Sequence, residues 1–334
     1  MFGTQFHRPV LALAVAFTLS VAAGCATGGR KAADAAVGAP VADAEWHSLV
    51  KSGRRAYLRN DFKGALPYFV SAAKRSRALD DPNGLAVALL DRARCLEEME
   101  ITVLLATLDE AASNGAPAAV EMSEEMRLLD ELLALRSDTR LPARRRAELD
   151  VAVAGLPRPP DEARAELKAI VARTPPDLLS PADRARLLFA RVDPLEPGDP
   201  DACDLLDQCP PDAELPPSLR ARRQIMLILH CGADELAALE SAAAIYREAG
   251  RADGVAFALS CVKHPSDPVH AADMLLRGAA ACHALGYAHL AASLLDGAEA
   301  VDDPAIRERA TALRASLRLP SAQVPSEPKG ESQP

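Results

Sequence analysis

Aromatic side chains are scarce in this sequence, and so are the β-branched residues that sheets favour. Its 334 residues include 1 Trp, 4 Tyr and 7 Phe, whereas 68 residues are Ala and 46 are Leu. Strands prefer β-branched and aromatic residues, whereas Ala and Leu are strong helix formers. The composition therefore argues against a β-sandwich, a barrel or a parallel α/β sheet, and it predicts an all-α fold.

The sequence also lacks the common signatures of catalysis and metal binding. It contains no G-x-G-x-x-G, P-loop, H-E-x-x-H or G-x-S-x-G motif, and no C-x-x-C. The acidic pairs Glu97-Glu98 and Glu124-Glu125 are adjacent in sequence, so each pair is split between helix faces, and we expect solvated side chains. We therefore expect no enzyme activity, no cofactor and no metal site.

Positive charge is not concentrated anywhere in the chain. The formal net charge is −9, and Lys contributes only 7 of the 38 basic residues. Three short basic runs, at 74–77, 144–146 and 220–223, are each flanked by acidic residues, so we interpret them as solvated helix faces. Nucleic-acid binding needs clustered positive charge to replace phosphate counterions, and we expect no such partner.

Residues 1–24 have the pattern of an export signal. Arg8 is the only Lys or Arg in the segment, and an apolar stretch follows from Val10 to Val21. That stretch is about 12 residues long, too short for a bilayer core of about 30 Å. Three small residues at 22–24 then complete the pattern of a cleavable signal peptide.

The five residues Val21-Ala22-Ala23-Gly24-Cys25 resemble the lipobox of bacterial lipoproteins. In that family the cysteine thiol receives diacylglycerol, the signal is cut before the cysteine, and the new amine is acylated with a chain such as palmitate. The resemblance implies lipidation of Cys25. Asp does not follow Cys25, which by resemblance to enteric lipoproteins implies an outer-membrane anchor facing the periplasm. The alternative is an ordinary secretory signal.

The rest of the chain predicts helices on a tether. Residues 25–44 are small and Gly/Ala-rich and predict a flexible tether after the lipidated cysteine. We expect an N-terminal helical lobe at 45–175, a Pro/Asp-rich connection at 176–217, a C-terminal lobe at 218–318 and a disordered tail at 319–334. Apolar periodicity and breakers predict helices at 45–59, 62–78, 84–98, 100–113, 118–136, 142–155, 160–173, 181–191, 218–231, 234–249, 252–263, 268–285, 287–300 and 304–317.

Three helical hairpins share a spacing of small and large residues. The first carries Leu49, Gly53, Ala65, Phe69 and Ala72. The last carries Leu275, Ala279, Gly286, Ala291, Leu295 and Ala298, and a weaker copy before it carries Ala243, Tyr246, Gly250, Val255 and Leu259. This spacing resembles the tetratricopeptide repeat (TPR). It implies an α-hairpin solenoid of one or two lobes; an irregular hairpin solenoid is the alternative.

The TPR resemblance also implies which side chains face a partner-binding groove. The first-helix positions that line the groove in TPR proteins correspond here to His47, Arg54, Tyr57, Glu240, Arg247 and His283. Arg54 and Tyr57 form the strongest anchor pair, because Arg and Tyr dominate interaction hot spots. The alternative is that all six are ordinary surface side chains.

Six cysteines follow Cys25, and export would permit disulfides among them. Cys203 and Cys209 flank a short segment and could pair locally. Cys231 and Cys261 are each near the end of a predicted helix, two helices apart, and could also pair. Cys95 and Cys282 lie among core positions and are expected to be buried thiols.

These features together predict a lipoprotein scaffold. The combination of lipobox and TPR-like hairpins resembles pilotins and assembly lipoproteins of pili and secretion systems. It implies a membrane-anchored periplasmic adaptor that binds envelope proteins and contacts the bilayer through Cys25. The alternatives are a periplasmic binding lipoprotein for cell-wall glycan or solute, and a helical cell-wall enzyme.

Overall fold

A computed structural model describes residues 44–114, 123–156, 160–262 and 267–319. Within these ranges the chain forms fourteen α-helices and two short 3₁₀ helices and has no strand, which confirms the predicted all-α fold. The expected signal peptide, Cys25 with its tether, and the tail from residue 320 onward lie outside the described residues. Among the residues that are described, no helix is long and apolar enough to cross a membrane.

The helices follow one another with short connections. In chain order they are α2 (Ala44–Tyr57), α3 (Phe62–Ala78), α4 (Pro82–Asn114), α5 (Ser123–Arg136), α6 (Ala143–Ala154), α7 (Pro160–Arg173), η1 (Pro176–Leu178), α8 (Pro181–Val192), α9 (Pro200–Asp207), η2 (Asp212–Glu214), α10 (Pro217–Cys231), α11 (Glu235–Glu248), α12 (Ala252–Ser260), α13 (Pro268–Ala284), α14 (Ala288–Glu299) and α15 (Pro304–Ser316). Most of the predicted bounds agree with these to within about two residues.

Proline marks where many helices begin. Pro181, Pro200, Pro268 and Pro304 each occupy the first helical position, after a Ser or Asp whose side chain accepts a backbone N–H of the first turn. Proline fits there because its missing N–H would have no intrahelical partner. The Pro/Asp-rich segment 176–217 accordingly contains the expected helix α8. It also contains α9, which the sequence did not predict.

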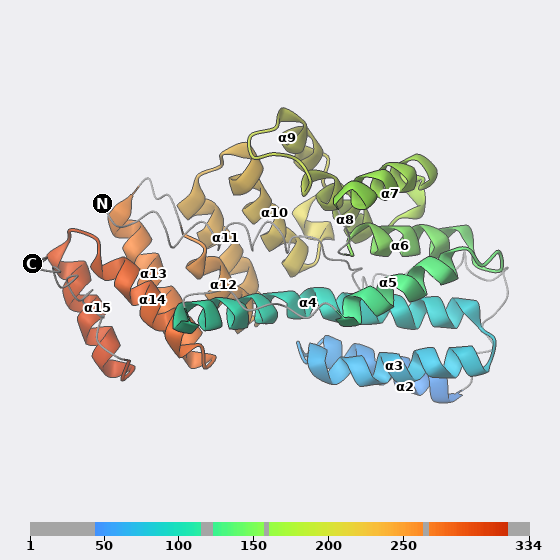
Figure 1. Cartoon of the computed structure of the whole chain (residues 1–334), viewed down its shortest axis with the longest axis horizontal. Coiled ribbons are helices and arrows are strands. Elements are labelled where there is room, and N and C mark those ends of the chain that lie inside the picture. Colours follow the sequence, from blue (N-terminus) through green and yellow to red (C-terminus); the bar gives the residue numbers. More distant parts are fainter. Residues whose placement is uncertain (1–43, 115–122, 157–159, 263–266, 320–334) are drawn as a thin grey trace, which may run out of the picture.

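The largest departure from the sequence prediction is α4. It is one helix of 33 residues, whereas two helices, 84–98 and 100–113, were expected. Only Met99 separates those ranges, and the adjoining Glu98 and Glu100 are good helix formers, so nothing interrupts the helix. At 1.5 Å per residue α4 is about 50 Å long. Figure 1 shows it running along the long axis of the molecule.

Helix α4 joins the two ends of the molecule. It packs against α2, α3, α5 and α6 near its start and against α12 and α14 near its end. Its buried Leu89 belongs to the core formed with α2, α3, α5 and α6, and its buried Leu105 to the core formed with α13, α14 and α15. Asp109 of α4 accepts the backbone N–H of Leu290 at 2.7 Å and so caps the first turn of α14.

Glycine lets the helices of two hairpins approach closely. A Cβ added to Gly53 of α2 would lie 2.7 Å from Cε1 of Phe69 in α3, so a larger residue there would force the Phe69 ring to shift. A Cβ on Gly254 of α12 would lie 2.3 Å from Cγ of Tyr246 in α11. The small residues Ala65 and Ala72 that accompany Phe69 are fully buried.

Candidate functional site

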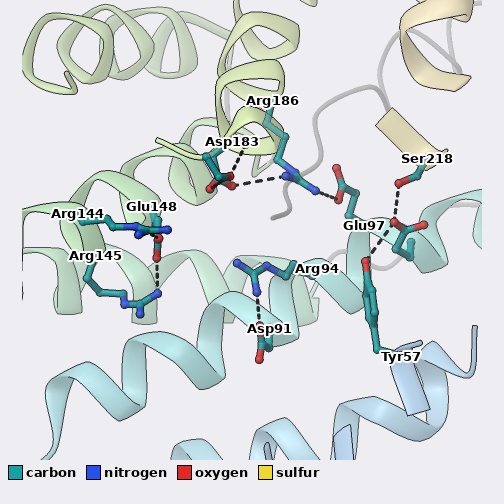
Figure 2. Close-up of polar contacts among 12 residues, drawn as sticks. Tyr57, Asp91, Arg94, Glu97, Arg144, Arg145, Glu148, Asp183, Arg186 and Ser218 are labelled. Carbon is teal, nitrogen blue, oxygen red and sulfur yellow. Dashed lines mark hydrogen bonds and ion pairs between the residues drawn. The ribbon is translucent and has the colours of Figure 1, made fainter. Parts of the chain in front are cut away.

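A buried polar cluster occupies the middle of α4, where the first hairpin meets α10 and α12. Glu98 of α4 is its centre. Its Oε1 accepts the hydroxyl of Tyr57 from α2 at 3.2 Å and that of Ser218 from α10 at 2.7 Å. Its Oε2 accepts Nη1 of Arg251, which stands directly before α12. One carboxylate therefore ties three other segments of the chain to α4. Figure 2 shows Tyr57 and Ser218, which approach this part of α4 from different sides.

Arg251 is held by more than its pairing with Glu98. Its Nη2 donates to the backbone oxygen of Glu98 at 2.9 Å and to Oδ2 of Asp253 at 2.8 Å. The guanidinium lies 4.6 Å from the ring centre of Phe62 and 6.0 Å from that of Tyr246, both cation–π distances. The hydrogen bonds and the rings offset the cost of burying this charge.

The neighbouring Glu97 has a poorer environment. Nη2 of Arg186, from α8, lies 3.6 Å from its Oε2, and neither oxygen of Glu97 accepts a hydrogen bond among the described residues. Burial disfavours the charged carboxylate and raises the pKa of Glu97 to about 7, with nearby Glu98 adding to the rise and Arg186 opposing it. Arg186 also faces Asp183 at 3.5 Å (Figure 2).

The expectation that Glu97-Glu98 is solvated was therefore wrong. Both side chains are at most 7% exposed. The two side chains leave α4 in different directions, as expected, but Glu97 lies near Arg186 of α8, and Glu98 contacts Ser218 of α10 and Arg251 before α12. Arg222 in the basic run 220–223 was also expected to be solvated, but it is largely buried. It pairs with Asp193 at 2.9 Å, and its guanidinium lies 5.6 Å from the ring centre of Phe189. The side chains of Glu124 and Glu125 lie outside the described residues.

Arg54 and Tyr57, the predicted anchor pair, are directed at α4. Nε of Arg54 donates to Asp91 at 2.7 Å, and the Tyr57 hydroxyl donates to Glu98. Burial raises the pKa of the Tyr57 hydroxyl, and the nearby carboxylates add to the rise. The polar ends of both side chains thus bind carboxylates of α4 within the same chain.

The other predicted groove residues lie at or near the surface. His47 of α2 and Arg247 of α11 are exposed, and Glu240 and His283 are half-buried. Glu240 of α11 pairs with two residues of α13, Arg277 at 2.6 Å and His270 at 3.2 Å. Glu240, Arg247 and His283 therefore lie on two helices joined by direct ion pairs.

An open cleft lies between α7, α8 and α9. Its volume is about 500 Å³, within the range of ligand pockets. Helix α7 contributes one face of its surface, with Arg164, Leu167, Lys168 and Val171 spaced by three or four residues. Sequence reasoning missed this cleft, because only the fold places α7 beside α9.

The opposite wall of the cleft is α9, with the end of α8 beside it. Asp201, Asp204, Leu205 and Gln208 face the cleft from α9 and its C-terminal cap. Arg191 from the last turn of α8 and Leu195 complete the lining. The cleft is thus lined by cations from α7 and α8, carboxylates from α9, and aliphatic side chains from α7, α9 and the segment after α8.

One disulfide fastens the α9 wall. Cys203 of α9 is bonded to Cys231 at the end of α10. Neither pairing suggested by the sequence, Cys203 with Cys209 or Cys231 with Cys261, occurs. The segment between Cys203 and Cys231 turns back through η2, which brings the end of α10 beside α9. The remaining described cysteines are thiols, and Cys95 and Cys282 are buried as expected.

The described residues contain no cluster of three or more His, Cys, Asp or Glu that could hold a metal ion. Burial raises the pKa of the Cys209 thiol to about 11 and that of Cys282 to about 12, so neither is a thiolate at neutral pH. No family model, curated protein or solved structure matches this chain.

Proposed function

We propose that this protein is an exported scaffold, anchored by a lipid at Cys25, that binds envelope proteins on the periplasmic side of the outer membrane. The observation that carries the proposal is the lipobox-like Val21–Cys25, placed directly after an apolar stretch too short to span a bilayer. Acyl chains on one cysteine anchor a protein through the burial of their CH₂ groups, each contributing about 0.8 kcal/mol.

The disulfide supports export independently of the N-terminal sequence. Cys203 and Cys231 are bonded in the folded chain, far from the lipobox in sequence. Disulfides persist in the bacterial periplasm and are rare in the cytosol, where thiols are kept reduced. A periplasmic location therefore accounts for both features.

The face of α11 and α13 is the surface that we propose for partner binding. Helix α4 packs on α12 and α14, whereas Glu240, Arg277 and His270 on α11 and α13 keep exposed fractions of about 40%. Arg309 of α15 extends the same charged face by pairing with Asp273 at 2.6 Å. Exposed pairs contribute little to stability, so they can be exchanged for contacts with a partner.

A lipid anchor would raise the effective concentration of this face near membrane partners. Residues 26–43 provide the chain between Cys25 and α2. An adaptor of this kind suits assembly of an envelope machine such as a pilus or a secretion apparatus, the role of the lipoproteins that the sequence resembles. Binding alone would serve this role, so we propose no catalytic activity.

In-cell crosslinking of the full chain, followed by purification from detergent-solubilised envelope, tests the proposal. We expect one envelope protein to be recovered in stoichiometric amount and the mature N-terminus to be an acylated Cys25. Cys25→Ser should remove the acyl chains and reduce recovery of the partner. Arg247→Glu on the proposed face should also reduce it, whereas Arg146→Glu, an exposed residue of α6, should not.

Two results would contradict different parts of the proposal. An unmodified N-terminus, or a wild-type chain recovered in the soluble fraction, would refute the lipid anchor. A correctly anchored chain that captures no protein, or whose partner is lost equally in the α6 control, would refute the scaffold role of the α11–α13 face.

A further inference from the structure

The charged side chains of the α7–α8–α9 cleft form no ion pairs with one another. The cations are Arg164 and Lys168 from α7 and Arg191 from the end of α8, and the carboxylates are Asp201 and Asp204 from α9. In the part of the chain that the structure describes, none of these five side chains takes part in an ion pair or a hydrogen bond. Opposite charges from different helices thus line one cleft without meeting in direct pairs.

Nearby helix junctions behave differently. Arg136 of α5 meets Glu166 of α7 at 2.6 Å, and Arg173 of α7 meets Asp150 of α6 at 2.7 Å. These contacts show that Arg and acidic side chains of adjoining helices close into direct pairs where the backbones allow it. The charges in the cleft are therefore available to a ligand that enters between the walls.

The apolar part of the lining defines the body of such a ligand. Leu167 and Val171 line the cleft from α7, Leu205 lines it from α9 and Leu195 from the segment after α8, and Val171 is 39% exposed. No lining residue is aromatic, so a planar base or ring would find no stacking partner. A volume of about 500 Å³ suits a compact ligand with aliphatic groups.

We infer that this cleft binds a short peptide with free termini and small aliphatic side chains. Its carboxylate would meet the guanidinium and ammonium groups of the α7 and α8 side, and its ammonium would meet Asp201 and Asp204. Aliphatic side chains would cover Leu167 and Leu205. This inference goes beyond the proposed scaffold function, because the α11–α13 face takes no part in it.

Calorimetric titration of the full chain in detergent with the tripeptide Ala-Leu-Ala tests the inference. We expect saturable binding that weakens about tenfold or more when the peptide is either N-acetylated or C-amidated, since each change removes one charge-assisted contact. Lys168→Gln should weaken the free tripeptide to a similar extent but leave the affinity for the amidated peptide unchanged. Asp204→Asn should do the same for the acetylated peptide.

Arg184→Gln is the matched control. Arg184 is an exposed cation on α8, the same helix as Arg191, and does not line the cleft. Its substitution should leave all affinities unchanged. Absence of saturable binding, equal affinity for the blocked and free peptides, or equal losses in Arg184→Gln and Lys168→Gln would each overturn the inference. None of these results would affect capture of an envelope protein, so the two proposals fail separately.

Discussion

Two adjacent glutamates of α4 are both buried, but only one of the two carboxylates is hydrogen-bonded. Glu98 accepts hydrogen bonds from Tyr57, Ser218 and Arg251, so its charge is compensated by donors on three other segments. Among the described residues, Glu97 accepts no hydrogen bond; the guanidinium of Arg186 lies 3.6 Å away, and Arg222 and Arg94 act on it only through their charge. Successive helix residues point in different directions, so one carboxylate stabilises the fold while its neighbour imposes a desolvation cost.

This difference predicts a pH dependence that can be assigned to one residue. The pKa of Glu97 rises from 4.5 to about 7 on folding, so the folded chain binds the extra proton and stability falls as the pH rises between these values. At 1.36 kcal/mol per pKa unit, Glu97 lowers the free energy of unfolding by about 3 kcal/mol at pH above 7, relative to pH below 4.5.

Denaturant unfolding of wild type and Glu97→Gln across this range measures the effect. The difference in unfolding free energy between the two proteins should change by about 3 kcal/mol between the ends of the range, in favour of the variant at high pH. Glu110→Gln, an exposed position of α4, should show no such change. A pH-independent difference for Glu97→Gln would contradict the prediction.

Removing the charge of Glu98 should destabilise the fold. Glu98→Gln keeps an acceptor for Tyr57 and Ser218 but leaves the buried guanidinium of Arg251 without its countercharge on α4. Removing one partner of a buried pair costs about 3–5 kcal/mol, and we expect a loss of that size in the free energy of unfolding at neutral pH. Glu110→Gln again serves as the control, and a loss below about 1 kcal/mol would show that Asp253 alone compensates Arg251.

At the scale of elements, helix positions could be predicted from the sequence because their starts are chemically marked. Asp267-Pro268 and Asp303-Pro304 each place an N-cap before a proline, and α13 and α15 begin there. Helix α9 escaped prediction although Asp199-Pro200 carries the same mark. Around Pro200 the density of prolines favours a loop, whereas proline at the first helical position is compatible with the start of a helix.

What the sequence could not supply is which helices meet. Glu98 and Arg251 are 153 residues apart, and no local period indicates that α4 reaches α12. The same limit explains the cysteines, since the partner of Cys203 is set by how α10 turns back on α9 and not by spacing. The lining of the α7–α8–α9 cleft likewise exists only after α7 and α9 are placed side by side.

The disulfide between α9 and α10 predicts that a reducing agent lowers the free energy of unfolding. In the chain-entropy description a bond that closes a loop of 28 residues contributes roughly 3–4 kcal/mol. Cys203→Ser with Cys231→Ser should lower the free energy of unfolding by about that amount, and a reducing agent should lower wild type to the same value without affecting the double variant. The double variant Cys209→Ser with Cys261→Ser serves as the control. It keeps the Cys203–Cys231 disulfide, so a reducing agent should still lower its free energy of unfolding.

At the scale of the whole molecule, α4 determines whether the chain unfolds as one cooperative unit or as two. A division at the Pro/Asp-rich segment would make the N-terminal and C-terminal lobes unfold separately. The described chain instead shares α4 between the core around Leu89 and the core around Leu105, and the pairs of Glu97 and Glu98 link α4 to α8 and α12. Because one continuous helix takes part in both cores, we expect their unfolding to be coupled.

We accordingly expect a single cooperative unfolding transition, and the one tryptophan provides the test. Trp46 is buried in the N-terminal core, so its fluorescence reports that end, whereas far-UV circular dichroism reports every helix. Leu105→Ala, in the distant core with α14, should cost about 2–5 kcal/mol and shift the Trp46 transition and the dichroism transition to the same lower midpoint. A Trp46 midpoint unchanged by Leu105→Ala would mean that α4 does not couple the two ends and that the chain is two independent lobes.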